Sequence, residues 1–136
     1  MNPLEEGSEL RLDFGKIAKV TKAAPDVIPV AIQHADTGEV ILVAYTNPLA
    51  FQKAVQTRTL VLWSTSRNEL WEKGKTSGES FHLVEVYVNC EQNSLLYRVR
   101  PKRGGICHTK NRSGKPRNCY YRRVNLDTLT LDNVDP

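Results

Sequence analysis

The segment DVIPVAIQHADTGEVILVAYT, residues 26–46, decides the fold class of this 136-residue chain. Two runs rich in β-branched residues flank the DTG triplet at 36–38, whose residue types suit a tight turn. The segment therefore predicts a β-hairpin. Directly after it, NPLAFQKAVQTR at 47–58 predicts a helix, with Asn47 as its cap and Pro48 in its first turn. Helical spacing directs four of its residues inward: Leu49, Ala50, Ala54 and Val55.

Further strands are expected after this helix. The segment LVLWSTS at 60–66 predicts a strand that runs into a polar loop at 67–80. The β-branched content of FHLVEVYVNC at 81–90 predicts a second strand, which pairs with SLLYRVRP at 94–101 across a short turn. The whole pattern predicts a small, strand-rich α+β single domain with one main helix over residues 26–124.

The two ends of the chain have a different character. Residues 1–25 are polar and weakly patterned, which predicts an N-terminal extension with a short helix at most. Residues 125–136 form an acidic C-terminal tail that we expect to fray. The N-terminus lacks the apolar core of a signal peptide, and no apolar run approaches the roughly 20 residues that cross a bilayer. We therefore expect a cytoplasmic protein without a membrane partner.

Basic residues are concentrated in one region. The net charge is +4, yet the stretch from Arg98 to Arg123 contains ten Lys and Arg residues and no Asp or Glu. This local excess favours an anion-binding site or a nucleic-acid patch over a generally basic protein. The GKTSG motif at 74–78 is not a P-loop, because Glu69 stands where the first glycine is required. The motif remains a donor-rich loop that can bind a phosphate.

The three cysteines, Cys90, Cys107 and Cys119, cannot all pair within one chain, and metal binding or catalysis is the better explanation for them. Neighbouring cations favour thiolates, the form that binds metal. Three thiolates leave one position open on a tetrahedral Zn²⁺, as in a catalytic site. His108 is the alternative fourth ligand, but adjacent residues seldom both reach one ion, so the open site is preferred. His108 is then the best candidate for an acid or a base.

Four motifs together resemble one enzyme family, phosphoribosyl-AMP cyclohydrolase. They are WSTSRNELWEKGKTSG (63–78), VNCEQNSLLYRV (88–99), GGICHT (104–109) and NCYYRR (118–123). The resemblance extends over roughly residues 27–124, and the long first motif is the most specific part. It implies that N1-(5-phosphoribosyl)-AMP, a phosphorylated nucleotide, is hydrolysed at the N1–C6 bond of its adenine ring in L-histidine biosynthesis.

The resemblance also implies a zinc site and an assembly. In that family, three cysteines contributed across the interface of a homodimer hold the zinc, and the matching residues here are Cys90, Cys107 and Cys119. Zinc would activate the attacking water, as it does in zinc deaminases. We assign His108 as the nearby base. The substrate-binding candidates are Trp63 for the base and Arg67, Lys73, Thr76, Ser77 and, less directly, Arg112 for phosphate and ribose.

Two features depart from the family pattern. The family's Asp-Cys-Asp-x-Asp turn, whose carboxylates bind Mg²⁺, is matched here by Asn89, Glu91 and Asn93. One carboxylate in place of three lowers the affinity for a hard cation, so Mg²⁺ is expected to bind weakly, through water or substrate phosphate, or to be dispensable. The loop between Cys107 and Cys119 is also about five residues longer than in the family, a length that a surface turn can absorb.

Two other functions compete with this interpretation. A divergent zinc hydrolase acting on another purine or pyrimidine nucleotide would explain the altered turn and the longer basic loop. A nucleic-acid-binding module with a structural zinc would use the arginine cluster and bind with strong salt dependence. That module would leave the 63–78 motif without a role, and the chain lacks the usual aromatic stacking platform, so we expect no nucleic-acid partner.

Overall fold

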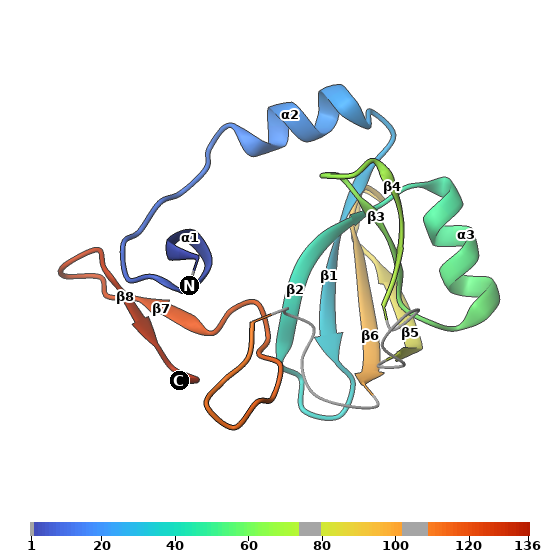
Figure 1. The fold of residues 1–136 in the computed structure, drawn as a ribbon. Coiled ribbons are helices and arrows are strands. Elements are labelled where there is room, and N and C mark those ends of the chain that lie inside the picture. The colour runs from blue at the N-terminus through green and yellow to red at the C-terminus, as the bar shows by residue number, and fades with distance from the viewer. Residues whose placement is uncertain (1, 74–79, 102–108) are drawn as a thin grey trace.

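The computed structural model describes residues 2–73, 80–101 and 109–136 (Figure 1). A four-stranded sheet forms its centre, in the order β2-β1-β6-β5. Its strands are β1 (Ile28–His34), β2 (Val40–Thr46), β5 (Phe81–Val88) and β6 (Leu95–Pro101). Strand β1 is antiparallel to β2 and parallel to β6, and β5 is antiparallel to β6. The predicted 26–46 hairpin and the pairing of 81–90 with 94–101 are confirmed.

Helix α3 (Pro48–Thr57) follows β2 and packs against the core. The Asn47 side chain accepts a hydrogen bond from the backbone N–H of Ala50 at 2.9 Å, so the predicted cap is confirmed. Ala50 and Ala54 are fully buried, whereas Leu49 and Val55 are exposed. The inward positions expected for Leu49 and Val55 were therefore wrong, because a narrow i, i+4 stripe of alanines contacts the sheet and leaves their neighbours about 100° away.

A second hairpin lies beside the central sheet. Strand β3 (Val61–Ser64) pairs with β4 (Glu69–Glu72) in antiparallel register, with Ser64 opposite Glu69. The predicted strand at 60–66 is confirmed, but the polar loop expected from residue 67 was wrong in its first part. The charged residues at both ends of ELWE hid a short strand, which Leu70 and Trp71 hold against the hydrophobic core.

The two ends of the chain are more ordered than expected. Helices α1 (Pro3–Glu6) and α2 (Lys16–Ala23) occupy the N-terminal region, and the strands β7 (Arg122–Val124) and β8 (Leu131–Asn133) pair near the C-terminus. The frayed tail and the single short N-terminal helix were therefore wrong expectations. In Figure 1, α1, β7 and β8 lie together on one side of the central sheet, and α3 lies on the other. The small, strand-rich α+β architecture is confirmed.

Within the described parts of the chain, no helix combines the length and the apolar character needed to cross a membrane. The hydrophobic core instead lies between the central sheet, α3 and the β3–β4 hairpin. Its largest fully buried side chains are Tyr97, Phe81, Ile32, Ile41 and Leu60. Because β2 and β3 both contribute to this core, their outer residues are held in fixed positions beside each other, and the candidate site begins there.

Candidate active site

A cavity of about 320 Å³ lies between β2 and the β3–β4 hairpin. We call it the Trp63 cavity. It brings together two predicted substrate-binding residues, Trp63 and Arg67. Its other lining residues are Leu42, Val43, Ala44, Tyr45, Leu62, Ser64, Thr65, Ser66 and Trp71. Indole and phenol rings beside three hydroxyls and a guanidinium offer both a surface for a flat base and donors for anionic oxygens.

The turn between β3 and β4 sets the position of Trp63 and Arg67. The indole Nε1–H of Trp63 donates to Asn68 Oδ1 at 3.2 Å, and Asn68 adopts a left-handed conformation with φ of 53°. The backbone N–H of Arg67 donates to Ser64 Oγ at 3.4 Å. These contacts hold the backbone of the turn, while the Arg67 guanidinium stays largely exposed, 3.4 Å from Glu69. Arg67 can therefore exchange its carboxylate partner for a phosphate at small cost.

Lys73 lies apart from Arg67. It follows β4, at the end of the hairpin opposite to the Ser64–Glu69 pair, and its ammonium is 5.9 Å from the centre of the Phe81 ring. Arg67 and Lys73 thus cannot grip the same phosphate from the positions they occupy. Thr76 and Ser77 lie outside the described residues. The structure therefore joins Trp63 to Arg67 and separates Lys73 from both.

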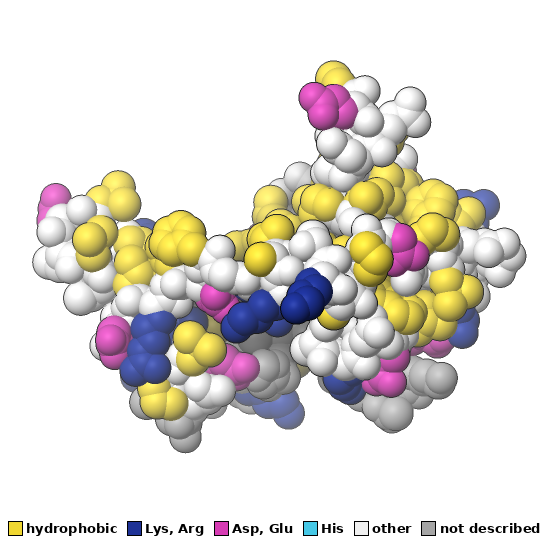
Figure 2. Space-filling view, turned by 90° about the horizontal axis from the view of Figure 1, so that it is seen from above, with side chains coloured by type: hydrophobic (Ala, Val, Ile, Leu, Met, Phe, Trp, Pro, Cys, Tyr) yellow, Lys and Arg dark blue, Asp and Glu magenta, His cyan; other side chains and the backbone are white. Residues whose placement is uncertain are grey.

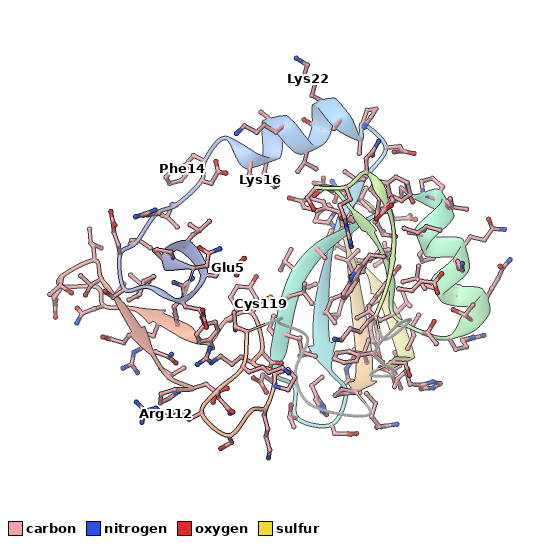
Figure 3. The ribbon with its side chains drawn as sticks, in the orientation of Figure 1. Glu5, Phe14, Lys16, Lys22, Arg112 and Cys119 are labelled. Atoms are coloured by element: carbon pink, nitrogen blue, oxygen red, sulfur yellow. The ribbon has the colours of Figure 1, made fainter. Side chains whose placement is uncertain are left out.

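Cys119 lies at the beginning of β2. Its backbone N–H donates to the carbonyl of Ile41 at 3.1 Å, and the neighbouring Asn118 donates from Nδ2 to Glu39 Oε1. The next residues of β2, from Leu42 to Tyr45, line the Trp63 cavity. Cys119 is exposed (Figure 3). Strand β2 therefore binds the backbone of Cys119 near its first residues and lines the cavity with its later ones.

Cys90 lies at the opposite end of the sheet, in the turn after β5. Cys90 lies three strand spacings across the sheet, and about five residues along it, from the point where Cys119 contacts Ile41. Together these two offsets correspond to a distance of about 20 Å. Zn–S bonds are about 2.3 Å long, so these two thiols cannot share an ion within one chain. Among the described residues, no three His, Cys, Asp or Glu side chains gather closely enough to hold a metal. Cys107 and His108 lie outside those residues.

The turn that carries Cys90 is closed by its own side chains. Asn89 Oδ1 accepts hydrogen bonds from the backbone N–H groups of Asn93 and Ser94, at 2.9 and 3.0 Å. The Asn89 amide donates to Asn93 Oδ1 at 2.6 Å, and the Asn93 amide donates to Glu91 Oε2 at 3.2 Å. Both amide oxygens and one carboxylate oxygen at the three predicted magnesium positions are therefore already engaged inside the turn.

Several arginines of the basic region at 98–123 form ion pairs or hydrogen bonds within the chain. Arg98 bonds Glu85 at 2.9 Å, and Arg100 makes a bidentate contact with Asp36. Hydrogen bonds from these arginines hold the pKa values of the Glu85 and Asp36 carboxyls below their usual ranges. Arg112 is exposed near the C-terminus and does not line the Trp63 cavity. The expectation of an anion-binding site therefore does not extend to all the basic residues between Arg98 and Arg123.

Surface charge agrees with this view. On the face drawn in Figure 2, Lys and Arg side chains lie in separate groups, and hydrophobic side chains gather over the half of the molecule that contains the sheet. The Arg122 guanidinium is also engaged within the chain, since it donates hydrogen bonds to the carbonyls of Gly7 and Leu4, both at 2.9 Å. A continuous basic groove for nucleic acid is not formed by the described residues of this face.

The sequence interpretation missed two aromatic residues of the cavity, Tyr45 and Trp71. Trp71 lies opposite Leu62 in the β3–β4 register, and Trp63 lies opposite Leu70. A signal for Trp71 was present in the ELWE segment at 69–72, where two apolar residues interrupt a polar run. Using that signal requires recognising the segment as a strand, β4. Tyr45 was hidden because the sequence of a hairpin does not tell which face of its second strand a later hairpin covers.

Comparison with known proteins agrees with these motifs. The family model described as phosphoribosyl-AMP cyclohydrolase matches residues 42–121. A phosphoribosyl-AMP cyclohydrolase of Hyphomonas neptunium is 42% identical over 93% of this chain and 86% of its own length. One of Caulobacter vibrioides is 43% identical over 73% of the chain and 68% of its own length. The histidine biosynthesis bifunctional protein HisIE of Thermus thermophilus is 41% identical over 72% of the chain and 43% of its own length. The chain therefore belongs to the phosphoribosyl-AMP cyclohydrolase family, hydrolases of histidine biosynthesis.

Proposed function

We propose that this enzyme hydrolyses the N1–C6 bond of N1-(5-phosphoribosyl)-AMP at a site shared between two copies of the chain. Each site would combine the Trp63 cavity and Cys119 of one copy with Cys90 of the other. The observation that carries the proposal is the separation of about 20 Å between the two cysteines within one chain. Cys119 bonds to Ile41 of β2, directly before the residues that line the cavity, so Cys90 is the ligand that a partner would supply.

The donor set fits zinc. Cys90 and Cys119 are exposed and form no disulfide bond among the described residues, and thiolates are preferred ligands of this ion. Cys107 completes the proposed set. When bound, zinc supplies Lewis acidity that lowers the pKa of a water and makes it nucleophilic near neutral pH. Three thiolate ligands leave one coordination position for that water.

The residues of the chain then bind and orient the nucleotide. The indole of Trp63 provides an aromatic face for a purine that carries positive charge after N1 substitution, which strengthens stacking. Arg67 provides a fork for one phosphate, and Lys73, at the far end of the hairpin, provides a point charge for the second. Thr76 and Ser77 remain our candidates for the ribose and phosphate, Arg112 a looser one, and His108 the candidate that transfers a proton during ring opening.

The homodimer has independent support at the Cys90 end. Residues Phe81 and Leu83 of β5 bond to the segment at 58–60, but the second half of the strand has no partner on its outer edge among the described residues. Val86, Tyr87 and Val88 are exposed there. An open apolar edge promotes association. Cys90 follows this edge directly, so a second copy that covers it would approach the metal ligand.

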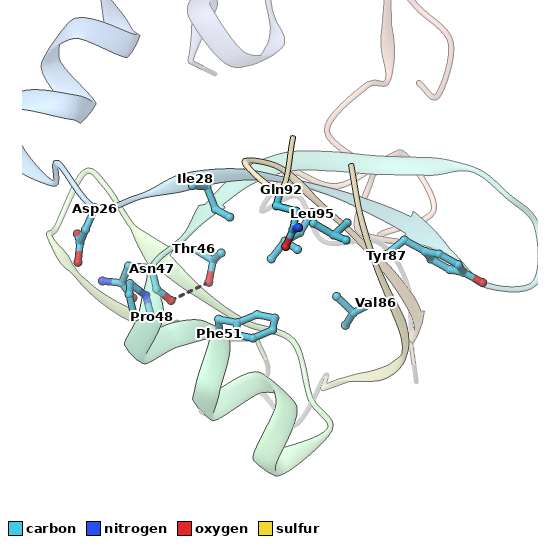
Figure 4. A pocket seen from close by; sticks show the side chains of 11 residues that line it. Asp26, Ile28, Thr46, Asn47, Pro48, Phe51, Val86, Tyr87, Gln92 and Leu95 are labelled. Atoms are coloured by element: carbon cyan, nitrogen blue, oxygen red, sulfur yellow. Dashed lines mark hydrogen bonds between the residues drawn. The ribbon is translucent and has the colours of Figure 1, made fainter. Parts of the chain in front are cut away.

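A groove of about 600 Å³ adjoins the same edge. Figure 4 shows Ile28, Phe51, Val86 and Leu95 around it, drawn from β1, α3, β5 and β6. Apolar and aromatic residues form most of its lining, and its polar residues are Asp26, Thr46, Asn47 and Gln92. A groove of this composition suits apolar side chains of a protein surface better than a bis-phosphorylated nucleotide. It therefore supports the homodimer and leaves the Trp63 cavity as the nucleotide site.

The turn after β5, which carries Cys90, does not suit Mg²⁺. This ion prefers nearly octahedral oxygen ligands with negative charge, whereas Asn89, Glu91 and Asn93 offer one carboxylate and bond to one another. We expect calorimetric titration of the zinc-loaded protein with Mg²⁺ to give no saturable binding at this turn. A triple variant, Asn89→Asp, Glu91→Asp and Asn93→Asp, should acquire it. Saturable binding by the unaltered protein that disappears in Glu91→Gln would contradict this expectation.

One preparation tests the proposed function as a whole. Zinc content is measured, and the protein is then incubated with N1-(5-phosphoribosyl)-AMP while the ring-opened product is followed. We expect close to one zinc per chain and turnover that a zinc chelator abolishes and added zinc restores. Turnover that survives complete zinc removal would refute the metal role. A loaded enzyme that opens a different purine or pyrimidine nucleotide and leaves this one intact would favour the divergent hydrolase.

A further inference from the structure

The chain termini meet next to Cys119. We call residues 2–9 together with residues 131–136 the terminal clasp. In Figure 1 both ends lie beside β7 and β8, away from α3. The N-terminal part pairs with the C-terminal hairpin through a bridge between Glu9 and Thr130 and a 2.8 Å bond from the Leu131 N–H to the Ser8 carbonyl. Residues from the two extremes of the sequence therefore form one structural unit.

The segment from Tyr121 onward is tied to the N-terminal part of the clasp. Tyr121 is buried, and its hydroxyl donates to the carbonyl of Glu5. Arg122 donates two further hydrogen bonds, from Nη1 to the Gly7 carbonyl and from Nη2 to the Leu4 carbonyl, both at 2.9 Å. Charge-assisted bonds of this kind are among the stronger ones in proteins. They fasten the residues just after Cys119 to α1.

The residues before Cys119 are tied to the C-terminal part. Arg117 is buried; its Nε donates to the Asp135 carbonyl at 2.7 Å and its Nη1 lies 3.4 Å from Glu6 Oε1. Its guanidinium also stacks 4.5 Å from the centre of the Tyr121 ring. The two buried side chains that flank Cys119 on either side thus touch each other, and both are anchored in the clasp.

The clasp also braces the basic loop that precedes Cys119. The Asn111 amide donates to Asp135 Oδ1 at 3.1 Å, and the Arg112 N–H donates to the carbonyl of Pro136 at 3.3 Å. Bonds from the N–H groups of Ser113 and Lys115 to Asn111 Oδ1 close the turn itself. This part of the loop is therefore folded into a tight turn that rests on residues 135 and 136.

The N-terminal residues also reach the surroundings of the thiol. Cys119 lines a cavity of about 360 Å³ together with Leu4, Leu10 and Arg122. Against the sheet, Cys119 is held by its own N–H bond to Ile41 and by Asn118. An exposed cysteine on a segment with little regular structure would otherwise lose conformational freedom when it binds a metal. Contacts that fix its backbone beforehand reduce that loss.

We propose that the terminal clasp is a positioning device for Cys119, so that residues 2–9 and 131–136 support the proposed metal centre from outside it. Arg117, Tyr121 and Arg122 act through the backbone of Cys119 and touch neither substrate nor metal. The proposal rests on the proposed role of Cys119 as a zinc ligand. It predicts that loosening the clasp weakens zinc binding and makes the Cys119 thiol more accessible, without changing the Trp63 cavity.

The test compares Arg122→Gln with Arg123→Gln, because Arg123 is the adjacent arginine, exposed on the same strand. Zinc affinity is measured by competition with a chromophoric chelator. We expect about 10-fold weaker binding for Arg122→Gln, the scale of effects from partners that orient metal ligands, and wild-type affinity for Arg123→Gln. Arg122→Lys, which retains one charged donor, should recover part of the loss. KM for the nucleotide at saturating zinc should stay unchanged.

A second readout separates this proposal from the zinc mechanism. In zinc-stripped protein, the alkylation rate of Cys119, resolved by peptide mass spectrometry, should rise severalfold in Arg122→Gln and stay at the wild-type value in Arg123→Gln. Equal rates and equal zinc affinities for the two variants would overturn the proposal. If the unaltered protein binds no zinc, the proposed mechanism fails and the alkylation rates alone decide. Should Arg122→Gln not fold, Tyr121→Phe takes its place under the same criteria.

Discussion

Mixing inactive Cys90→Ser protein with inactive Cys119→Ser protein is expected to restore about a quarter of the wild-type activity per chain. In a symmetric dimer with ligands from both copies, random exchange makes about half of the dimers mixed, and each mixed dimer has one of its two sites intact. Each variant alone should lose zinc and essentially all turnover, because two thiolates hold the ion poorly. Product formation after refolding the two variants together measures the recovery.

A matched mixture distinguishes the shared site from a site within one chain. Wild-type protein refolded with the Cys90→Ser/Cys119→Ser double variant gives mixed dimers with no intact site if the ligands come from both copies, and with one intact site if they come from one copy. If the site is shared, activity should therefore be recovered in the first mixture, and the activity per wild-type chain should fall in the second. No recovery in the first mixture, with full activity of the wild-type chains in the second, would place both ligands in one chain.

The sequence was sufficient for features that depend on local pattern. The hairpin at 26–46 followed from β-branched runs around a turn, and the Asn47 cap followed from a side chain that satisfies a free N–H group of α3. Leu49 and Val55 failed because helical spacing gives the apolar side of a helix but not the width of the stripe that a sheet covers. That width is a property of packing between elements.

The remaining differences come from long-range contacts. The polar tail forms β8 because its backbone pairs with β7 and with the N-terminal segment, more than a hundred residues away in sequence. Periodicity within the tail carries no trace of these partners. The same holds for the separation of Cys90 from Cys119, which depends on the β2-β1-β6-β5 strand order. Motif resemblance suggested the ligands, whereas topology explains why one chain cannot bring them together.

Arg67→Ala is expected to raise KM for the bis-phosphorylated substrate about 10- to 100-fold with a much smaller change in kcat. A hydrogen bond to a charged group contributes about 1.5–3 kcal/mol, which corresponds to this range. The Arg67 guanidinium is mostly exposed and lies 3.4 Å from Glu69, an exposed pair of little energetic value. Under the proposed function, this lining residue of the Trp63 cavity is therefore available for a phosphate of the substrate.

Steady-state kinetics at two salt concentrations provide the measurement, with Arg123→Ala as the control, because this exposed arginine lies on β7, which Figure 1 places across the central sheet from the β3–β4 hairpin. Arg67→Ala should show a flatter dependence of KM on salt than Arg123→Ala, since one phosphate contact is missing. Glu69→Gln should lower KM slightly by removing the competing carboxylate. A fall in kcat with unchanged KM would assign Arg67 to the reacting atoms and contradict its role in holding phosphate.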